Sequence, residues 1–253
     1  MALRKAIVAG NWKMNNLVAE AVALAEEVRS SLGQVRTVDV AVCPTYTSLY
    51  AVGKALEGSL IQLGAQDAYI KPSGAFTGEI SPQMLLDVGC MWTIIGHSER
   101  RHVLGESDAL QNAKTRFALS SGLKVMFCIG ELLDERKANI TNKVLERQLT
   151  LGLAGLSPEN LENVVIAYEP VWAIGTGETA SPEQAEEAHV FIRGWVAKVF
   201  GDASASQMRI QYGGSVTPKT VEGLFEKENI DGFLVGGASL KPVDFAVIVQ
   251  ACA

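Results

Sequence analysis

The chain lacks the features that mark several large classes of protein. Its four cysteines, Cys43, Cys90, Cys128 and Cys252, lie far apart and form neither a CxxC pair nor a metal-ligand spacing. We therefore expect free buried thiols in a reducing compartment, and no metal site. No apolar run approaches the length of a membrane span, and strand-like sequence begins almost at once, without a signal peptide. Together these absences predict a cytoplasmic protein with no membrane partner.

Runs of basic residues are absent as well. The chain has 22 Lys and Arg residues against 28 Asp and Glu residues, for a net charge of −6. Because a nucleic-acid binder usually presents a basic face, we expect no nucleic-acid partner. An anionic ligand would have to be held by local features, against a weakly repulsive overall field.

Short apolar runs alternate with helical segments along the whole chain. The runs show no polar alternation, which is typical of strands covered on both faces in a parallel sheet. Eight repeats of roughly 30 residues, with no low-complexity linker between them, predict one domain over residues 1–253. No GxGxxG follows the first strand, so a dinucleotide-binding fold is disfavoured and the α/β class predicted is a (β/α)8 barrel. The candidate strands are residues 5–10, 38–43, 60–64, 92–95, 124–128, 164–168, 210–212 and 232–235.

The most informative segment is residues 164–177. Its first five residues are apolar or aromatic and predict a buried strand. Glu169 follows directly, and Pro170 biases it toward extended geometry, so the strand should end on this carboxylate. The loop beyond is first apolar and then glycine-rich, and it closes on a helix start formed by Ser181, Pro182 and Gln184. A carboxylate beneath a loop that folds over it suggests chemistry from which water is excluded.

Other chemically useful residues also follow strands, and in a (β/α)8 barrel the active site forms at the C-terminal strand ends. Asn11 and Lys13 follow the first strand, His97 follows the fourth and Glu169 the sixth. Taken alone, each has an ordinary alternative: a surface lysine, a corner histidine or a structural ion pair. Taken together, a carboxylate base, an imidazole and a cation suit removal of a proton beside a carbonyl, with stabilised enediolate oxygens.

His97 carries a further expectation. With Ser98 as the N-cap of the next helix, the positive helix end should lower the pKa of His97 and keep its imidazole neutral. A neutral imidazole donates a hydrogen bond to a carbonyl oxygen. Glu99 is either a first-turn helix residue or a partner of Lys13.

Two glycine pairs follow the last two strands, as Gly213-Gly214-Ser215 and Gly236-Gly237. They either turn tight corners or bind an anion through backbone amides, as the last two loops of such barrels often do. Two pairs at adjacent strand ends, with Ser215 as an added donor, favour anion binding.

The connection at residues 66–81 is long for a strand-to-helix loop. It contains Gly74-Ala75-Phe76-Thr77-Gly78-Glu79, and a Phe76 exposed at its tip would be unfavourable in a monomer. This loop is therefore a candidate subunit contact.

Several motifs, in this order along the chain, resemble the triosephosphate isomerase family. The resemblance covers essentially the whole chain, and the motifs together are highly specific. They are Asn11-Trp12-Lys13-Met14-Asn15, the loop motif just quoted, Ile95-Gly96-His97-Ser98-Glu99-Arg100-Arg101, Cys128-Ile129-Gly130-Glu131, residues 167–177 and Tyr212-Gly213-Gly214-Ser215-Val216.

The resemblance implies a TIM barrel that interconverts dihydroxyacetone phosphate and glyceraldehyde 3-phosphate without cofactor or metal. It implies that Glu169 moves the proton, that His97 and Asn11 polarise the substrate oxygens, and that Lys13 binds substrate electrostatically. It further implies a lid over residues 171–180 and a homodimer in which Thr77 braces the neighbouring subunit's Asn11 and Lys13. The backbone amides implied in phosphate binding are those of Gly175, Ser215, Gly236 and Gly237. The far end of the lid reads Glu178-Thr179-Ala180, where the family often has lysine at the first position.

Two other functions compete with this interpretation. A Schiff-base aldolase would use Lys13 as nucleophile, but the residues around it are not strongly apolar, and Glu169 would have no task. A phosphosugar-binding protein would bind without isomerisation, yet every catalytic position of the family pattern is filled.

Overall fold

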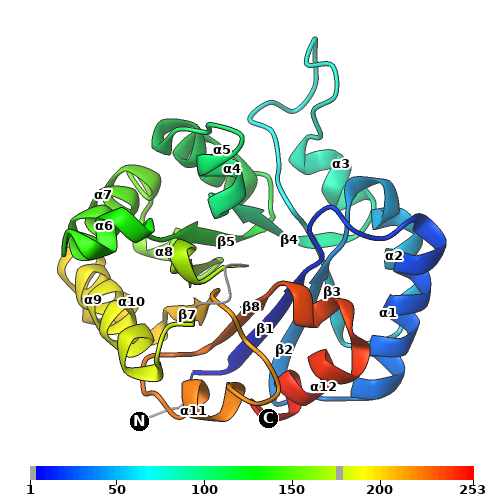
Figure 1. The fold of residues 1–253 in the computed structure, drawn as a ribbon. Coiled ribbons are helices and arrows are strands. Elements are labelled where there is room, and N and C mark those ends of the chain that lie inside the picture. The colour runs from blue at the N-terminus through cyan, green and yellow to red at the C-terminus, as the bar shows by residue number, and fades with distance from the viewer. Residues whose placement is uncertain (1–3, 175–178) are drawn as a thin grey trace.

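The computed structural model describes residues 4–174 and 179–253. Eight parallel strands form a closed barrel in which each strand pairs with the next and β8 pairs with β1 (Figure 1). This confirms the predicted (β/α)8 barrel. The predicted strand bounds are either identical to the observed ones or differ from them by one or two residues. The strands are β1 Ala6–Asn11, β2 Val38–Cys43, β3 Ile61–Ala65, β4 Cys90–Ile95, β5 Lys124–Ile129, β6 Val164–Tyr168, β7 Arg209–Tyr212 and β8 Gly232–Val235.

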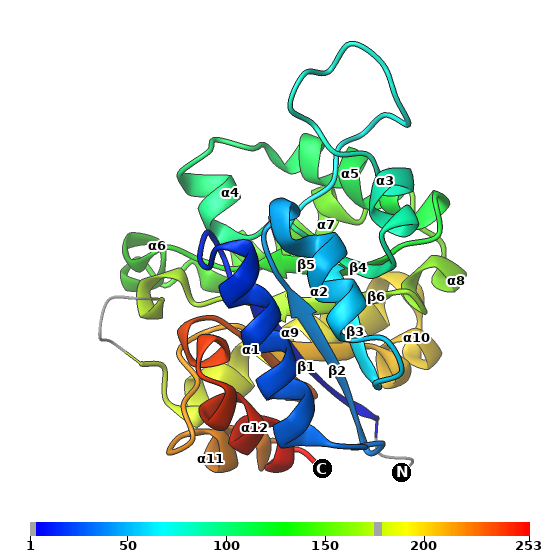
Figure 2. The same cartoon turned by 90° about the vertical axis from the view of Figure 1, so that its right-hand side faces the viewer.

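The helices surround the barrel and pack their apolar faces on the outer side of the strands (Figures 1 and 2). α9 begins as predicted, with Ser181 accepting from the Gln184 amide and Pro182 at the first helical position. The α-helices are α1 Val18–Leu32, α2 Leu49–Ala55, α3 Pro82–Asp87, α4 Ser98–His102, α5 Asp108–Ser120, α6 Leu133–Lys137, α7 Thr141–Gly152, α8 Pro158–Leu161, α9 Pro182–Phe200, α10 Asp202–Gln207, α11 Val221–Phe225 and α12 Pro242–Gln250. Short 3-10 helices are η1 Tyr46–Ser48, η2 Val171–Ala173 and η3 Gly237–Leu240. No helix of the described ranges is long and apolar enough to cross a membrane.

Burial on both strand faces explains why the strands show no polar alternation. On β1, Ile7 and Ala9 belong to the cluster that fills the barrel, whereas Ala6 and Val8 belong to the larger cluster between strands and helices. Successive side chains of a strand point to opposite faces, so both faces must be apolar here. The filled interior leaves the loops at the strand ends as the place for a site.

The loop between β3 and α3, residues 66–81, stands away from the barrel in both views (Figures 1 and 2). Within it the Tyr69 and Phe76 rings lie 4.9 Å apart, and Phe76 is 36% exposed. Local contacts hold the loop together, including the Tyr69 amide donating to the Ile80 carbonyl at 2.9 Å.

Candidate active site

A cavity of about 370 Å³ opens at the C-terminal ends of the strands. It brings together residues that lie up to 233 positions apart in the sequence, from Asn11 to Asp244. Of the predicted site residues, Gly175 lies outside the described residues. All the others line this cavity: Asn11, Lys13, His97, Glu169, Ser215, Gly236 and Gly237.

Glu169 follows β6 directly and is 2% exposed. Its Oε2 accepts from the Ser98 amide at 2.9 Å, and its Oε1 lies 2.9 Å from His97 Nε2. Burial raises the pKa of Glu169, but His97, the Ser98 amide and Lys13 together outweigh it, so the pKa is lowered. The carboxylate is therefore charged at neutral pH and is poised beside the cavity.

Glycines on the neighbouring strand ends give Glu169 its place. A Cβ at Gly130 would lie 1.7 Å from the Glu169 carbonyl oxygen, and one at Gly213 would lie 2.9 Å from its Cγ. Either contact would force the backbone or the side chain of Glu169 to move. These two glycines therefore allow the close approach of β5 and β7 around this residue.

His97 is the N-cap of α4, whereas the sequence predicted Ser98 in that role. Its Nδ1 accepts from the Glu99 amide at 3.2 Å, and only a ring nitrogen with a free lone pair can accept. The proton of the neutral ring must then be on Nε2, which faces Glu169. The prediction missed this because a histidine seldom caps a helix with its own ring.

The expected lowering of the His97 pKa by the helix end is wrong for this arrangement. Burial does lower the pKa of His97, but the Glu169 carboxylate beside Nε2 favours the protonated ring more strongly, so the pKa is raised. Two influences thus oppose each other: the Glu99 amide requires a bare Nδ1, and the carboxylate of Glu169 favours a charged ring.

Lys13 reaches the cavity from a strained backbone, with φ of 51°. Its amide donates to Asn11 Oδ1 at 3.0 Å, and its carbonyl accepts from Gln66 Nε2 at 2.7 Å. Gln66, just past β3, also donates to the Cys43 carbonyl at 2.9 Å. Sequence reasoning missed Gln66; its only signal was its position directly after a strand.

The Lys13 ammonium pairs with Glu99 Oε1 at 2.7 Å, which is the second of the two roles considered for Glu99. The Nζ also lies 4.0 Å from the position that a Cβ would take at Gly236. The cation is therefore fixed between the α4 side of the cavity and the glycine pair after β8.

The loops after β7 and β8 line the other half of the cavity with backbone. Gly214 must be glycine, because a Cβ there would lie 2.2 Å from the Tyr212 hydroxyl. After β8, Gly236 and Gly237 lead into η3, and Ser239 donates to the Gly236 carbonyl at 2.7 Å. The glycine-rich backbone that lines the cavity beside Lys13 is suited to bind an oxyanion through its amides.

The described part of the predicted lid is anchored on Glu131, a buried residue after β5. Trp172 Nε1 donates to Glu131 Oε1 at 2.9 Å, and the Tyr168 hydroxyl lies 3.1 Å from both carboxylate oxygens. The Arg136 guanidinium lies 3.2 Å from Glu131 and 5.0 Å from the Trp172 ring centre. Sequence reasoning quoted Glu131 in a motif without giving it a role. Residues 175–178 of the lid, including Glu178, lie outside the described residues.

The arrangement combines a charged carboxylate, an imidazole with its proton on Nε2, a fixed cation and a backbone surface for an anion in one cavity. In such a site a base removes a proton while preorganised donors stabilise the oxygen that becomes negative. In the described ranges, no three His, Cys, Asp or Glu side chains are grouped so as to hold a metal ion.

Comparison with known proteins gives a consistent result. The family model described as triosephosphate isomerase matches residues 6–252. A protein named triosephosphate isomerase from Chlorobium phaeobacteroides is 52% identical over 250 residues, covering 98% of this chain and 99% of its own length. Proteins of the same name from Carboxydothermus hydrogenoformans and Clostridium novyi are 52% and 51% identical over 248 residues, each covering 98% of this chain and 99% of their own length.

Proposed function

The chain belongs to the triosephosphate isomerase family, and from this we propose how its own residues carry out the reaction. The activity is the interconversion of dihydroxyacetone phosphate and D-glyceraldehyde 3-phosphate, a step of glycolysis and gluconeogenesis. The observation that carries the assignment of roles is the contact between Glu169 and His97 Nε2 at the cavity wall. It joins the base and the hydrogen-bond donor that an enediolate intermediate requires.

We propose that Glu169 takes a proton from the carbon beside the carbonyl and returns it to the neighbouring carbon. His97, through its Nε2 proton, and Asn11 would donate to the two substrate oxygens that exchange negative charge. Glu169 must first leave the Ser98 amide and His97, because each of its two oxygens already has one of them as a partner. Lys13 would balance the added negative charge. At an effective dielectric near 20, the attraction between its ammonium and an anion ~4 Å away is about 4 kcal/mol, and removing Lys13 would lose it.

The substrate phosphate would bind the amides after β7 and β8, those of Ser215, Gly236 and Gly237, within reach of Lys13. Gly175 would add an amide when the lid closes, and residues 171–180 would form that lid. Closure would exclude water and strengthen each electrostatic contact in the site.

We also propose a homodimer formed through the loop at residues 66–81. Large apolar side chains are exposed on this loop, on η1 and α3, and on the connections after β1 and α4, and burying them would favour association. Thr77, on the same loop, would reach the partner's site near Asn11 and Lys13. The apolar side chains are Met14 at 93%, Tyr46 at 39%, Phe76 at 36%, Met84 at 52%, Val103 at 77% and Leu104 at 62% exposure.

We further propose that residues 1–253 fold as one domain and that the protein works in the cytoplasm. Both proposals rest on the sequence pattern, with no linker between the repeats and no apolar span. The mass of the purified protein in solution tests the dimer, and limited proteolysis tests the single domain.

A coupled isomerase assay on Glu169→Gln tests the proposed function. We expect turnover to fall by about 10² to 10⁴-fold, because the amide cannot accept the proton. Far-ultraviolet circular dichroism should be unchanged. Glu146→Gln, an exposed residue of α7, is the matched control and should retain full turnover. Near-normal turnover in Glu169→Gln would contradict the assignment.

A further inference from the structure

Two lysines line the described part of the cavity, and they differ in their surroundings. Lys13 is inside, with a side chain 26% exposed and Glu99 at 2.7 Å. Lys241 is at the rim, with a side chain 75% exposed and its nearest carboxylate, Asp244, at 3.9 Å. The mechanism above uses Lys13 and gives Lys241 no role.

The backbone of Lys241 is tied to the proposed phosphate site. It follows η3 immediately, four residues after Gly237, and its amide donates to the Ala238 carbonyl at 3.2 Å. At its other side it precedes α12, where its carbonyl accepts from the Phe245 amide at 2.9 Å. The root of the side chain is therefore fixed, while its ammonium remains in solvent at the cavity mouth.

The charges around the cavity make this position important for an approaching dianion. The chain carries a net charge of −6, so the long-range field repels a phosphate ester. Inside, the charge of Lys13 is offset by Glu99, and Glu169 adds a further negative charge. An exposed ion pair at 3.9 Å, such as Lys241 with Asp244, is weak and leaves the lysine's field largely available to a ligand.

We propose that Lys241 captures the substrate: its ammonium draws the phosphate dianion to the mouth of the cavity, before the Gly236–Gly237 amides and Lys13 bind it. Lys241 thus acts on the encounter and not on proton transfer, and Asp244 moderates its field. This role rests on the proposed function, because it takes a phosphorylated substrate as given. Its signature is a change in kcat/KM that depends on salt and on the substrate phosphate, with little change in kcat.

The test compares Lys241→Gln with Lys198→Gln, an exposed lysine of α9 that makes no part of the cavity wall. Both variants change the net charge by the same amount, so any difference between them is local. At about 10 mM ionic strength we expect Lys241→Gln to lower kcat/KM by about threefold to tenfold relative to Lys198→Gln. The difference should shrink toward zero by about 0.3 M salt, where exposed charges are screened.

Three further measurements separate capture from a structural effect. Lys241→Arg should restore kcat/KM, Asp244→Asn should raise it by about twofold at low salt, and unphosphorylated D-glyceraldehyde should be converted equally well by all variants. Equal kcat/KM for Lys241→Gln and Lys198→Gln at every ionic strength would overturn the role of Lys241. So would an equal loss toward D-glyceraldehyde. Wild-type protein without isomerase activity would instead overturn the proposed function.

Discussion

Glu169 and Asp231 are buried carboxylates at opposite ends of the barrel, and they are 2% and 6% exposed. Glu169 follows β6 and faces the cavity, where each of its oxygens has one partner. Asp231 precedes β8 and is not among the described residues that line the active-site cavity. It accepts hydrogen bonds from two arginines and a backbone amide. The two carboxylates are equally hidden from water, so burial alone does not distinguish a catalytic carboxylate from a structural one.

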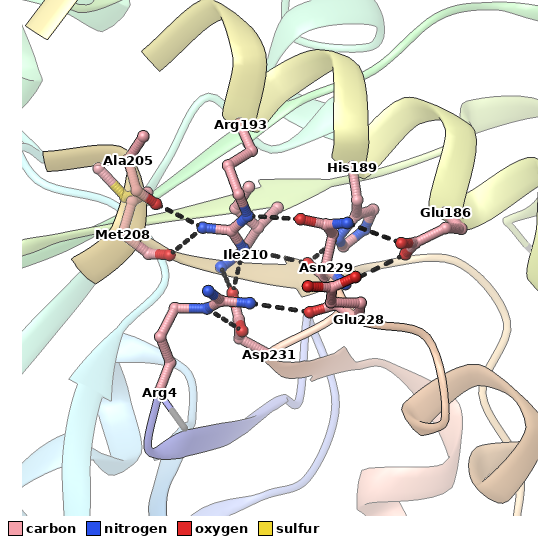
Figure 3. Close-up of polar contacts among 10 residues, drawn as sticks. All are labelled: Arg4, Glu186, His189, Arg193, Ala205, Met208, Ile210, Glu228, Asn229 and Asp231. Atoms are coloured by element: carbon pink, nitrogen blue, oxygen red, sulfur yellow. Dashed lines mark hydrogen bonds and ion pairs between the residues drawn. The ribbon is translucent and has the colours of Figure 1, made fainter. Parts of the chain in front are cut away.

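The Asp231 cluster is satisfied on every side (Figure 3). Its Oδ1 accepts from Arg4 Nε at 2.5 Å, and its Oδ2 accepts from Arg193 at 2.7 Å and from the Ile210 amide at 2.8 Å. Arg193, from α9, also donates hydrogen bonds of 2.7 to 3.3 Å to other oxygens. These are the carbonyls of Ala205, Met208 and Asn229 and the side-chain oxygen of Asn229. These bonds join α9 and α10 to β7, β8 and the segment before β1. A fully paired buried charge fixes geometry, whereas one that faces a cavity is available for chemistry.

Isosteric amides at the two positions should separate these roles with the largest effect. Asp231→Asn leaves the partly buried Arg4 and Arg193 without their carboxylate. Breaking a buried pair costs about 3 to 5 kcal/mol in the free energy of unfolding, and the partial exposure of the arginines puts this variant at the lower end of that range. We expect that loss in urea titrations at fixed protein concentration, with kcat/KM per folded protein within about threefold of wild type. Glu169→Gln should show the reverse, with lost turnover and a much smaller change in stability. Equal losses of stability in both variants would contradict the distinction.

Two histidines, His189 and His97, show the same contrast between a structural and an active-site residue. The His189 ring is fully buried between Tyr168 and Tyr212, with ring centres 5.8 and 6.4 Å away, and its Nδ1 lies 3.0 Å from the Asn229 carbonyl. Its Nε2 has no hydrogen-bond partner in the described part of the chain. Burial lowers the pKa of His189 to about 3, whereas the pKa of His97 is raised by Glu169.

His189 should therefore make stability depend on pH. Its folded pKa of about 3 lies below the unfolded value of 6.5, so between these values the unfolded state binds more protons. Stability should then fall as pH falls through this window, by about 1.4 kcal/mol per pH unit for this one group. His189→Asn keeps a donor near the Asn229 carbonyl and should remove this slope from unfolding curves at pH 4.5 to 6.5. His102→Gln, which alters an exposed histidine, should leave the slope nearly unchanged; an unchanged slope in His189→Asn would exclude this origin.

The sequence predicted one half of this comparison much better than the other. The strand 164–168, the cap at Ser181 and the strand-end residues Lys13 and Glu169 are visible because apolar runs, turn residues and strand order are local properties. The Asp231 cluster joins Arg4 to residues near the other end of the chain, and the environment of His189 comes from three separate segments, so local patterns cannot reveal either. Gln66 was missed for the same reason: its task is to hold the carbonyl of Lys13, 53 residues away.

The charge state of Glu169 depends on His97, and this can be tested. Burial raises the pKa of Glu169, and His97 is the largest influence that lowers it. In His97→Gln the burial stays and the imidazole beside the carboxylate is lost, so the pKa of Glu169 should rise. Because the base must be deprotonated, the acid limb of kcat/KM should move to higher pH than in wild type. The substrate's own titration is common to both proteins and cancels in the comparison. An acid limb at the same pH in both would show that His97 does not set the charge state of Glu169.

Glu131 shares features with both the structural carboxylate Asp231 and the active-site carboxylate Glu169. It is buried and well bonded like Asp231, yet one of its partners, Trp172, belongs to the proposed lid of the active site. Arg136 braces this contact from α6, over the Trp172 ring and against Glu131. Arg136→Met should lower the free energy of unfolding by less than Asp231→Asn does, because Glu131 keeps the hydrogen bonds from Tyr168 and Trp172 when the arginine is removed. Arg136 holds Trp172 against Glu131, so its loss should lower the free-energy cost of moving Trp172 in lid closure, and a phosphate-bearing competitive inhibitor should bind about two- to fivefold tighter. Arg136→Lys, which keeps the charge without the planar stacking, should lie between the two. Weaker inhibitor binding in Arg136→Met would instead mean that the arginine supports the closed lid.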